Sequence, residues 1–135
     1  MRQLMILMVV VVTLSGPAAA QTRVSVEGGA YTDVTPAGLA AMLRTRHAPL
    51  INVHVPYEGE IEGTDRFIAF DQIEANLGQL PADKTARIVL YCRSGHMSAI
   101  AAQALVKRGY RDVWNLAGGM IAWEQRGFPL RHAPQ

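Results

Sequence analysis

Cysteine is scarce in this chain of 135 residues, because Cys92 is the only one. A single thiol cannot form an internal disulfide, so this cysteine is either a buried, inert residue or a reactive one. Clusters of Lys and Arg are lacking as well, and the formal net charge is only +2 at pH 7. Proteins that bind nucleic acids carry such clusters, so we expect small molecules or proteins as partners and no nucleic acid.

Internal repeats, low-complexity tracts and linkers are also missing from the sequence. The length suits one compact domain, and a hydrophobic share of 50% is ordinary for a globular protein. These features predict a single domain with one continuous chain of structural elements.

The amino terminus differs from the rest of the chain. Arg2 precedes an apolar run over residues 4–14, which is followed by Ser-Gly-Pro and by three alanines that end at Ala20. A positive start, a short apolar run and an Ala-x-Ala site are typical of a secretory signal peptide, and a membrane span needs roughly 20 apolar residues. We predict a signal peptide over residues 1–20 and a periplasmic or secreted domain over residues 21–135. The alternative is an uncleaved amino-terminal anchor, whereas a lipoprotein is excluded because no cysteine follows the run.

Short apolar and β-branched stretches alternate with amphipathic stretches along the remaining chain. The expected strands cover residues 24–26 with Tyr31, interrupted by Gly28 and Gly29, and residues 50–55, 67–70, 86–91 and 113–116. The expected helices begin after Thr35, after Asp71, at Ser98 and at Met120, with Thr35 and Asp71 as caps. Such alternation implies right-handed crossovers, so we predict an α/β fold with a mostly parallel central sheet flanked by helices on both faces.

Cys92 follows the strand expected over residues 86–91, and ligand sites in parallel sheets lie beyond the carboxyl ends of strands. Residues 92–97 have to turn the chain into the next helix, and Gly95 allows a backbone conformation that other residues resist. Amides of such a turn attract anions, and Arg93 adds a positive charge, so we expect a thiolate with a lowered pKa. The alternative is a strand-end cysteine that packs as a small hydrophobic residue.

Three segments carry a wider pattern in the sequence. They are residues 52–54 with residues 59–64, residues 91–98 (YCRSGHMS), and residues 114–123 (WNLAGGMIAW) with residues 127–129. In this order they resemble the rhodanese domain of the sulfurtransferases, over nearly all of the chain after residue 20. The resemblance implies a single-domain rhodanese fold.

The resemblance also implies a chemistry of thiosulfate sulfurtransferase type in which Cys92 is the catalytic nucleophile. The thiolate attacks the outer sulfur of thiosulfate or a persulfide, holds it as a Cys92 persulfide, and passes it to cyanide, a thiol or a partner protein. The residues expected to bind the persulfide are Arg93, Ser94, Gly95, His96 and Met97. We expect no cofactor and, after removal of the leader, no membrane partner.

The sequence also departs from the family pattern. Asn52 replaces an acid, His54 replaces an arginine, and Met97 stands where many members that use thiosulfate carry a cationic or hydroxyl side chain. These changes keep open a non-catalytic binding module or a sulfur or redox sensor. A cysteine phosphatase is disfavoured, because it needs an arginine six positions after the cysteine, and here that residue is Ser98.

Other polar and aromatic residues have simpler interpretations. His47, His54 and His132 have no metal-ligand spacing, so we predict no metal site, and His96 is more often a loop residue without a catalytic role. The acidic residues of the loop over residues 56–66 are expected mainly to solubilise it; they are Glu58, Glu60, Glu62 and Asp65. We expect Trp114 and Trp123 to be packing residues.

Overall fold

The structure is a computed structural model that describes residues 20–45 and 48–132. The predicted signal peptide over residues 1–20 therefore lies, except for Ala20, outside the described residues, as does His47. In the described ranges no helix is both long enough and apolar enough to cross a membrane.

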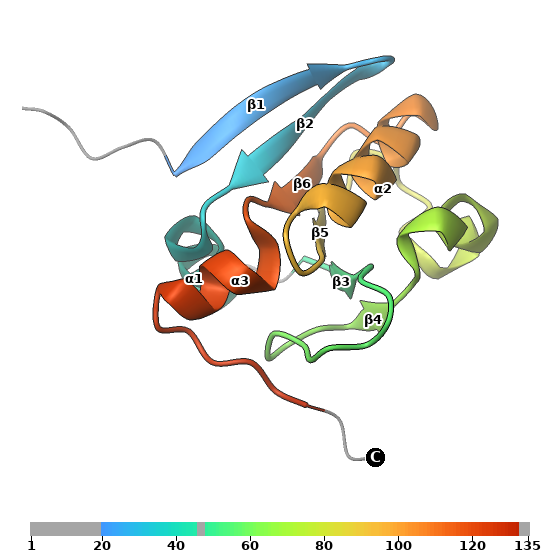
Figure 1. The fold of residues 1–135 in the computed structure, drawn as a ribbon. Coiled ribbons are helices and arrows are strands. Elements are labelled where there is room, and N and C mark those ends of the chain that lie inside the picture. The colour runs from blue at the N-terminus through green and yellow to red at the C-terminus, as the bar shows by residue number, and fades with distance from the viewer. Residues whose placement is uncertain (1–19, 46–47, 133–135) are drawn as a thin grey trace, which may run out of the picture.

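Six strands form one sheet with the order β1-β2-β6-β5-β3-β4 (Figure 1). The strands are β1 (Gln21–Val26), β2 (Gly29–Val34), β3 (Leu50–Asn52), β4 (Arg66–Phe67), β5 (Ile88–Tyr91) and β6 (Val113–Leu116). Every neighbouring pair is parallel except β1 with β2. The predicted mostly parallel sheet is confirmed, and β5, which ends next to Cys92, is central.

The first predicted strand is a hairpin rather than one interrupted strand. β1 and β2 pair antiparallel over six residue pairs, from Gln21 opposite Val34 to Val26 opposite Gly29. Gly28 lies in the turn with φ of +89°, a conformation that glycine adopts at little cost. The sequence signal for the break was correct, but it marked a reversal of the chain.

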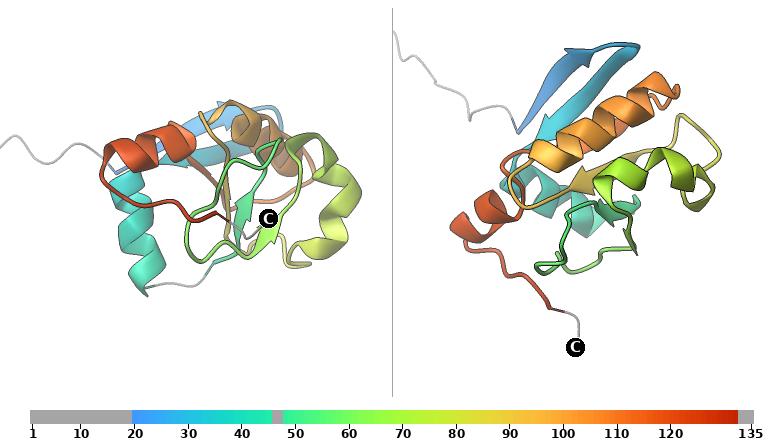
Figure 2. Two further views of the ribbon diagram at one scale, coloured as in Figure 1. Left: turned by 60° about the horizontal axis from the view of Figure 1, so that its bottom comes forward. Right: turned by 45° about the vertical axis from the view of Figure 1, so that its right-hand side comes forward.

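Helices cover both faces of the sheet, as predicted (Figure 2). On one face α1 (Pro36–Thr45) and α3 (Gly119–Gln125) pack in a core with Leu50 and Leu116; on the other, α2 (His96–Lys107) packs with Ile51, Leu90 and Cys92. The predicted start of α1 is confirmed, because the Thr35 side-chain oxygen accepts a hydrogen bond from Gly38 N at 3.1 Å.

The helix predicted after Asp71 is wrong. The chain instead forms two 3₁₀ segments, η1 (Phe70–Gln72) and η2 (Glu74–Gln79), and no side chain caps either one. Asn76 interrupts η2 with φ of −122°, and its amide Nδ2 donates to the Gln72 carbonyl, which competes with regular helix bonding. Gly78 lowers helix propensity further. Ile73 is nevertheless fully buried, so the apolar positions were assigned correctly.

Candidate functional site

Cys92 lies immediately after β5, at the carboxyl edge of the central sheet strands. Its side chain is 1% exposed and belongs to the core under α2. Two donors lie within hydrogen-bond distance of its sulfur: Gly95 N at 3.1 Å and Ser98 Oγ at 3.3 Å, and the Ser98 hydroxyl lies equally close, at 3.3 Å, to the Gly95 carbonyl. A buried sulfur with two polar donors is better suited to a negative charge than one surrounded by apolar groups alone.

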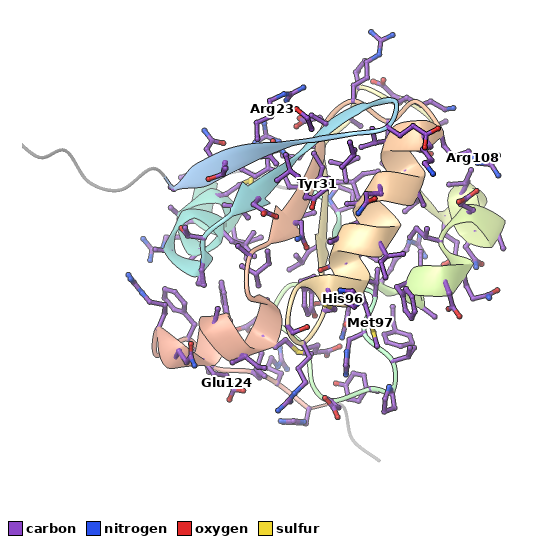
Figure 3. The ribbon with its side chains drawn as sticks, turned by 45° about the horizontal axis from the view of Figure 1, so that its top comes forward. Arg23, Tyr31, His96, Met97, Arg108 and Glu124 are labelled. Carbon is purple, nitrogen blue, oxygen red and sulfur yellow. The ribbon has the colours of Figure 1, made fainter. Side chains whose placement is uncertain are left out.

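The loop after Cys92 is shorter than predicted. α2 begins at His96, two residues before the expected Ser98, because Gly95 takes the left-handed conformation with φ of +95° at the amino-terminal cap. His96 and Met97 therefore belong to the first turn of α2 and not to the loop. Figure 3 shows both at the end of α2 opposite to Arg108. Met97 is half-buried and packs against the core, whereas His96 is exposed.

The first turn of α3 binds the backbone of the loop that contains Cys92 and Arg93. Met120 N donates to the Cys92 carbonyl at 2.9 Å, and Ile121 N donates to the Arg93 carbonyl at 3.0 Å. A Cβ on Gly119 would overlap the Cys92 and Arg93 backbone, so only glycine permits this approach. Sequence reasoning assigned no function to this contact, although the Gly118-Gly119 pair was a signal for it.

The two altered residues, Asn52 at the end of β3 and His54 just after it, bind each other and the following loop. The Asn52 side-chain oxygen accepts from His54 N at 3.0 Å, and its Nδ2 donates to the Gly59 carbonyl at 3.0 Å. His54 is 7% exposed, and its Nε2 lies 2.9 Å from a carboxylate oxygen of Glu58. At the positions of the replaced charge pair the chain therefore has a hydrogen-bonded turn.

Glu58 connects this turn to the cysteine loop. The same Glu58 oxygen, Oε2, lies 3.3 Å from Arg93 NH1. Two of the three remaining acidic residues of the loop have other partners: Glu62 pairs with Arg131, and Asp65 accepts a bond from Leu50 N. Glu58 therefore makes a specific contact in addition to being exposed to solvent, and this contact depends on a tertiary approach that sequence spacing does not show.

Tyr91 fixes the far side of the same loop. Its hydroxyl accepts a hydrogen bond from Ile61 N at 3.0 Å and lies 2.6 Å from Thr64 Oγ1, which in turn donates to the Ile61 carbonyl. Burial raises the pKa of Tyr91 to about 12, and the bonds from Thr64 and Ile61 act in the opposite direction. The residue before Cys92 therefore ties the loop carrying Glu58 to the central strand.

The two tryptophans lie in packing environments. Trp123 is buried and its Nε1 donates to the Pro129 carbonyl, while Trp114 lies under the Arg87 guanidinium at 4.3 Å from ring centre to Cζ. Both are packing residues in this sense. Across residues 20–45 and 48–132, no three His, Cys, Asp or Glu side chains are grouped closely enough to hold a metal ion.

Comparison with known proteins identifies the family of this chain. The profile of the rhodanese-like domain matches residues 35–126. A sulfurtransferase of Allochromatium vinosum is 41% identical over 58 residues, which cover 43% of this chain and 52% of that protein. A probable adenylyltransferase/sulfurtransferase MoeZ of Mycobacterium tuberculosis is 37% identical over 101 residues, covering 71% of this chain and 25% of that protein.

A solved structure agrees with this result. The rhodanese-like domain protein from Staphylococcus aureus matches with a TM-score of 0.61 and 25% identity, covering 74% of this chain and 98% of that one. The chain belongs to the rhodanese-like domain family, and its fold is that of a single rhodanese domain. It spans about half of the first curated relative's length and a quarter of the second's.

Proposed function

We propose that this domain is a sulfurtransferase that carries sulfur as a persulfide on Cys92. The observation that carries the proposal is the pair of donors, Gly95 N and Ser98 Oγ, at 3.1 and 3.3 Å from the Cys92 sulfur. Membership in a family that includes sulfurtransferases supports it. Both donors stabilise negative charge on sulfur, which is the form that acts as a nucleophile.

The first half-reaction uses thiosulfate or a persulfide as donor. The Cys92 thiolate forms a bond to the outer sulfur of thiosulfate, the S–S bond of the donor breaks, and sulfite leaves with its electron pair. In the second half-reaction the Cys92 persulfide is the sulfur donor. Cyanide or an acceptor thiolate attacks its terminal sulfur, the S–S bond breaks, and the Cys92 thiolate is regenerated. Arg93, at the exposed rim of the loop, is the cation that attracts an anionic donor.

Phosphate chemistry is less compatible with this loop. The position where a cysteine phosphatase needs an arginine holds Ser98, which is fully buried and donates to the cysteine sulfur. No guanidinium is therefore directed from the first turn of α2 toward a bound oxyanion. This supports transfer of a single sulfur atom.

Export is a separate part of the proposal. The apolar run over residues 4–14 and the Ala-x-Ala site before Gln21 support a domain that works in the periplasm or outside the cell. Amino-terminal sequencing of the protein from its native compartment tests this. A start at Gln21 is expected, and a start at Met1 would contradict cleavage.

Turnover tests the catalytic proposal. We expect thiosulfate and cyanide to give thiocyanate, with parallel lines in double-reciprocal plots because the two half-reactions are separate. Cys92→Ser is expected to abolish the product. Intact mass after incubation with thiosulfate alone should show a gain of one sulfur atom that reductant removes.

Burial of the cysteine favours a second candidate. A sulfur that is 1% exposed is difficult for an acceptor to approach, which suits a sensor that takes up sulfur without passing it on. The same two measurements separate the functions. A protein that gains one sulfur atom but forms no thiocyanate is a sensor, and one that does neither is a binding module.

A further inference from the structure

Glu58 forms an ion pair with Arg93, the only arginine or lysine among residues 92–98. The NH1 of Arg93 lies 3.3 Å from Glu58 Oε2, and both side chains are about half exposed, at 50% and 40%. The charge that would attract an anionic donor is therefore already paired within the protein.

His54 fixes the position of Glu58. The His54 ring is buried, its Nε2 lies 2.9 Å from the same Glu58 oxygen, and its Nδ1 is buried without a hydrogen-bond partner. This pattern assigns the ring hydrogen to Nε2, because a hydrogen on Nδ1 would be a buried donor without an acceptor. A rigid imidazole thus holds the carboxylate where it meets Arg93.

The consequence is competition for Arg93. A thiosulfate dianion that approaches Cys92 has to displace Glu58 from the guanidinium or bind without it. The Glu58 charge also repels the dianion directly, since like charges at short range raise its energy. A donor without net negative charge pays neither penalty. The arrangement therefore selects among donors by their charge.

We propose that Glu58 is a specificity-determining residue that disfavours dianionic donors and favours persulfides of small thiols without net negative charge. The proposal deepens the sulfur-transfer function proposed above and rests on it. A suitable donor is cysteamine persulfide, whose ammonium group leaves it without net negative charge. It reacts as the hydropersulfide, whose terminal sulfur carries a hydrogen: the Cys92 thiolate bonds to this sulfur, the donor S–S bond breaks, and cysteamine leaves as a thiolate that takes up the hydrogen of the new Cys92 persulfide.

The test is the ratio of kcat/KM for thiosulfate to kcat/KM for cysteamine persulfide, with cyanide as the common acceptor. In Glu58→Gln we expect this ratio to rise about fivefold, through a lower KM for thiosulfate at unchanged kcat. The gain should shrink in about 0.5 M salt, where charge effects are screened. The matched control is Glu62→Gln, the same change in the same loop, whose partner is Arg131; its ratio should stay within about twofold of the parent.

A second variant separates competition from simple repulsion. In an Arg93→Gln background, Glu58→Gln should raise the ratio less than about twofold, because no guanidinium remains to be released. A Glu58→Gln ratio equal to that of the parent overturns the proposal, whereas a full gain without Arg93 keeps Glu58 as the selecting residue and overturns the competition for the guanidinium in favour of direct repulsion. If the parent protein transfers sulfur from neither donor, the proposed sulfurtransferase function fails instead. Circular dichroism and the unfolding midpoint of each variant identify loss of folding.

Discussion

The backbone N–H of Met120 lies 2.9 Å from the carbonyl oxygen of Cys92 and donates a hydrogen bond to it. The contact joins the first turn of α3 to a loop that precedes it by more than 20 residues in sequence. Because the two carbonyls of Cys92 and Arg93 point to α3, the amide of Gly95 on the other side of the turn is left to face the cysteine sulfur. The orientation of the backbone around the Cys92 sulfur therefore depends on its contact with α3.

Gly119→Ala tests this dependence. The new methyl group would overlap the backbone of Cys92 and Arg93, and φ of +58° disfavours a side chain by itself. We expect a loss of roughly 2–4 kcal/mol in the free energy of unfolding and a loss of sulfur transfer exceeding the unfolded fraction. The control is Gly127→Ala, also at positive φ, where nothing lies within 4 Å of the new Cβ. It should lose only about 1 kcal/mol and keep its activity. Equal effects of the two substitutions would show that the approach of α3 is unimportant.

Local sequence patterns predicted most of the scaffold. The cap at Thr35 and the apolar strand before Cys92 are recorded in adjacent residues, so they could be assigned directly. The start of α2 was placed two residues late, because His96 and Met97 were assigned to the turn, while the helix begins directly after Gly95. The 3₁₀ segments were missed because the apolar spacing of the segment fits a helix, and Asn76 overrides it locally.

The candidate site was predictable at its centre and less so at its rim. The role of Cys92 could be predicted because this residue follows a central strand, and that of Gly95 because the chain has to turn there into the next helix. The contact of Glu58 with Arg93 joins two residues that lie 35 positions apart in the sequence, and no spacing rule indicates it. The same holds for Met120, whose amide acts through the backbone and leaves no side-chain signal.

Ser98→Ala removes one of the two donors to the cysteine sulfur. Ser98 is fully buried, and its Oγ lies 3.3 Å from Sγ. We expect persulfide formation, followed by intact mass after mixing with thiosulfate, to slow about tenfold, because a hydrogen bond to a charged group contributes about 1.5–3 kcal/mol. The control is Ser25→Ala on the exposed strand β1, which should react at the parent rate. An unchanged rate in Ser98→Ala would assign this hydroxyl to packing alone.

Asn52→Asp restores the acid that the family pattern contains at this position, and we expect it to be harmful here. The Asn52 side chain is 1% exposed, and its Nδ2 donates to the Gly59 carbonyl. A carboxylate would place an oxygen against that carbonyl oxygen inside the core. We expect a loss of about 2–4 kcal/mol at pH 7, measured by urea unfolding. Stability equal to that of the parent would mean that the loop rearranges around the acid.

Alkaline pH should weaken the fold through Tyr91. Its pKa is raised from 10.0 to about 12 by burial, so the folded state keeps this proton when the unfolded chain has lost it. The stabilisation from the neutral hydroxyl is therefore complete below pH 10 and is lost as pH rises from 10 through about 12. Tyr91→Phe removes this contribution, although it costs roughly 1–3 kcal/mol at neutral pH because Ile61 N loses its acceptor.

Tyr110→Phe is the matched control for this pH dependence. Tyr110 is buried and its hydroxyl donates to the Pro81 carbonyl at 3.2 Å, so the substitution also removes one hydrogen bond. Burial, with a smaller contribution from Asp33, raises the pKa of Tyr31 too, and both variants retain that part of the alkaline slope. The slope of unfolding free energy between pH 10 and 12 should therefore decrease in Tyr91→Phe relative to the parent. Tyr110→Phe, measured alongside, shows how far the loss of a buried hydroxyl and its hydrogen bond changes the slope by itself. If Tyr91→Phe keeps the parent slope, Tyr91 ionises as readily in the folded protein as in the unfolded chain, and its hydroxyl does not anchor the loop that carries Glu58.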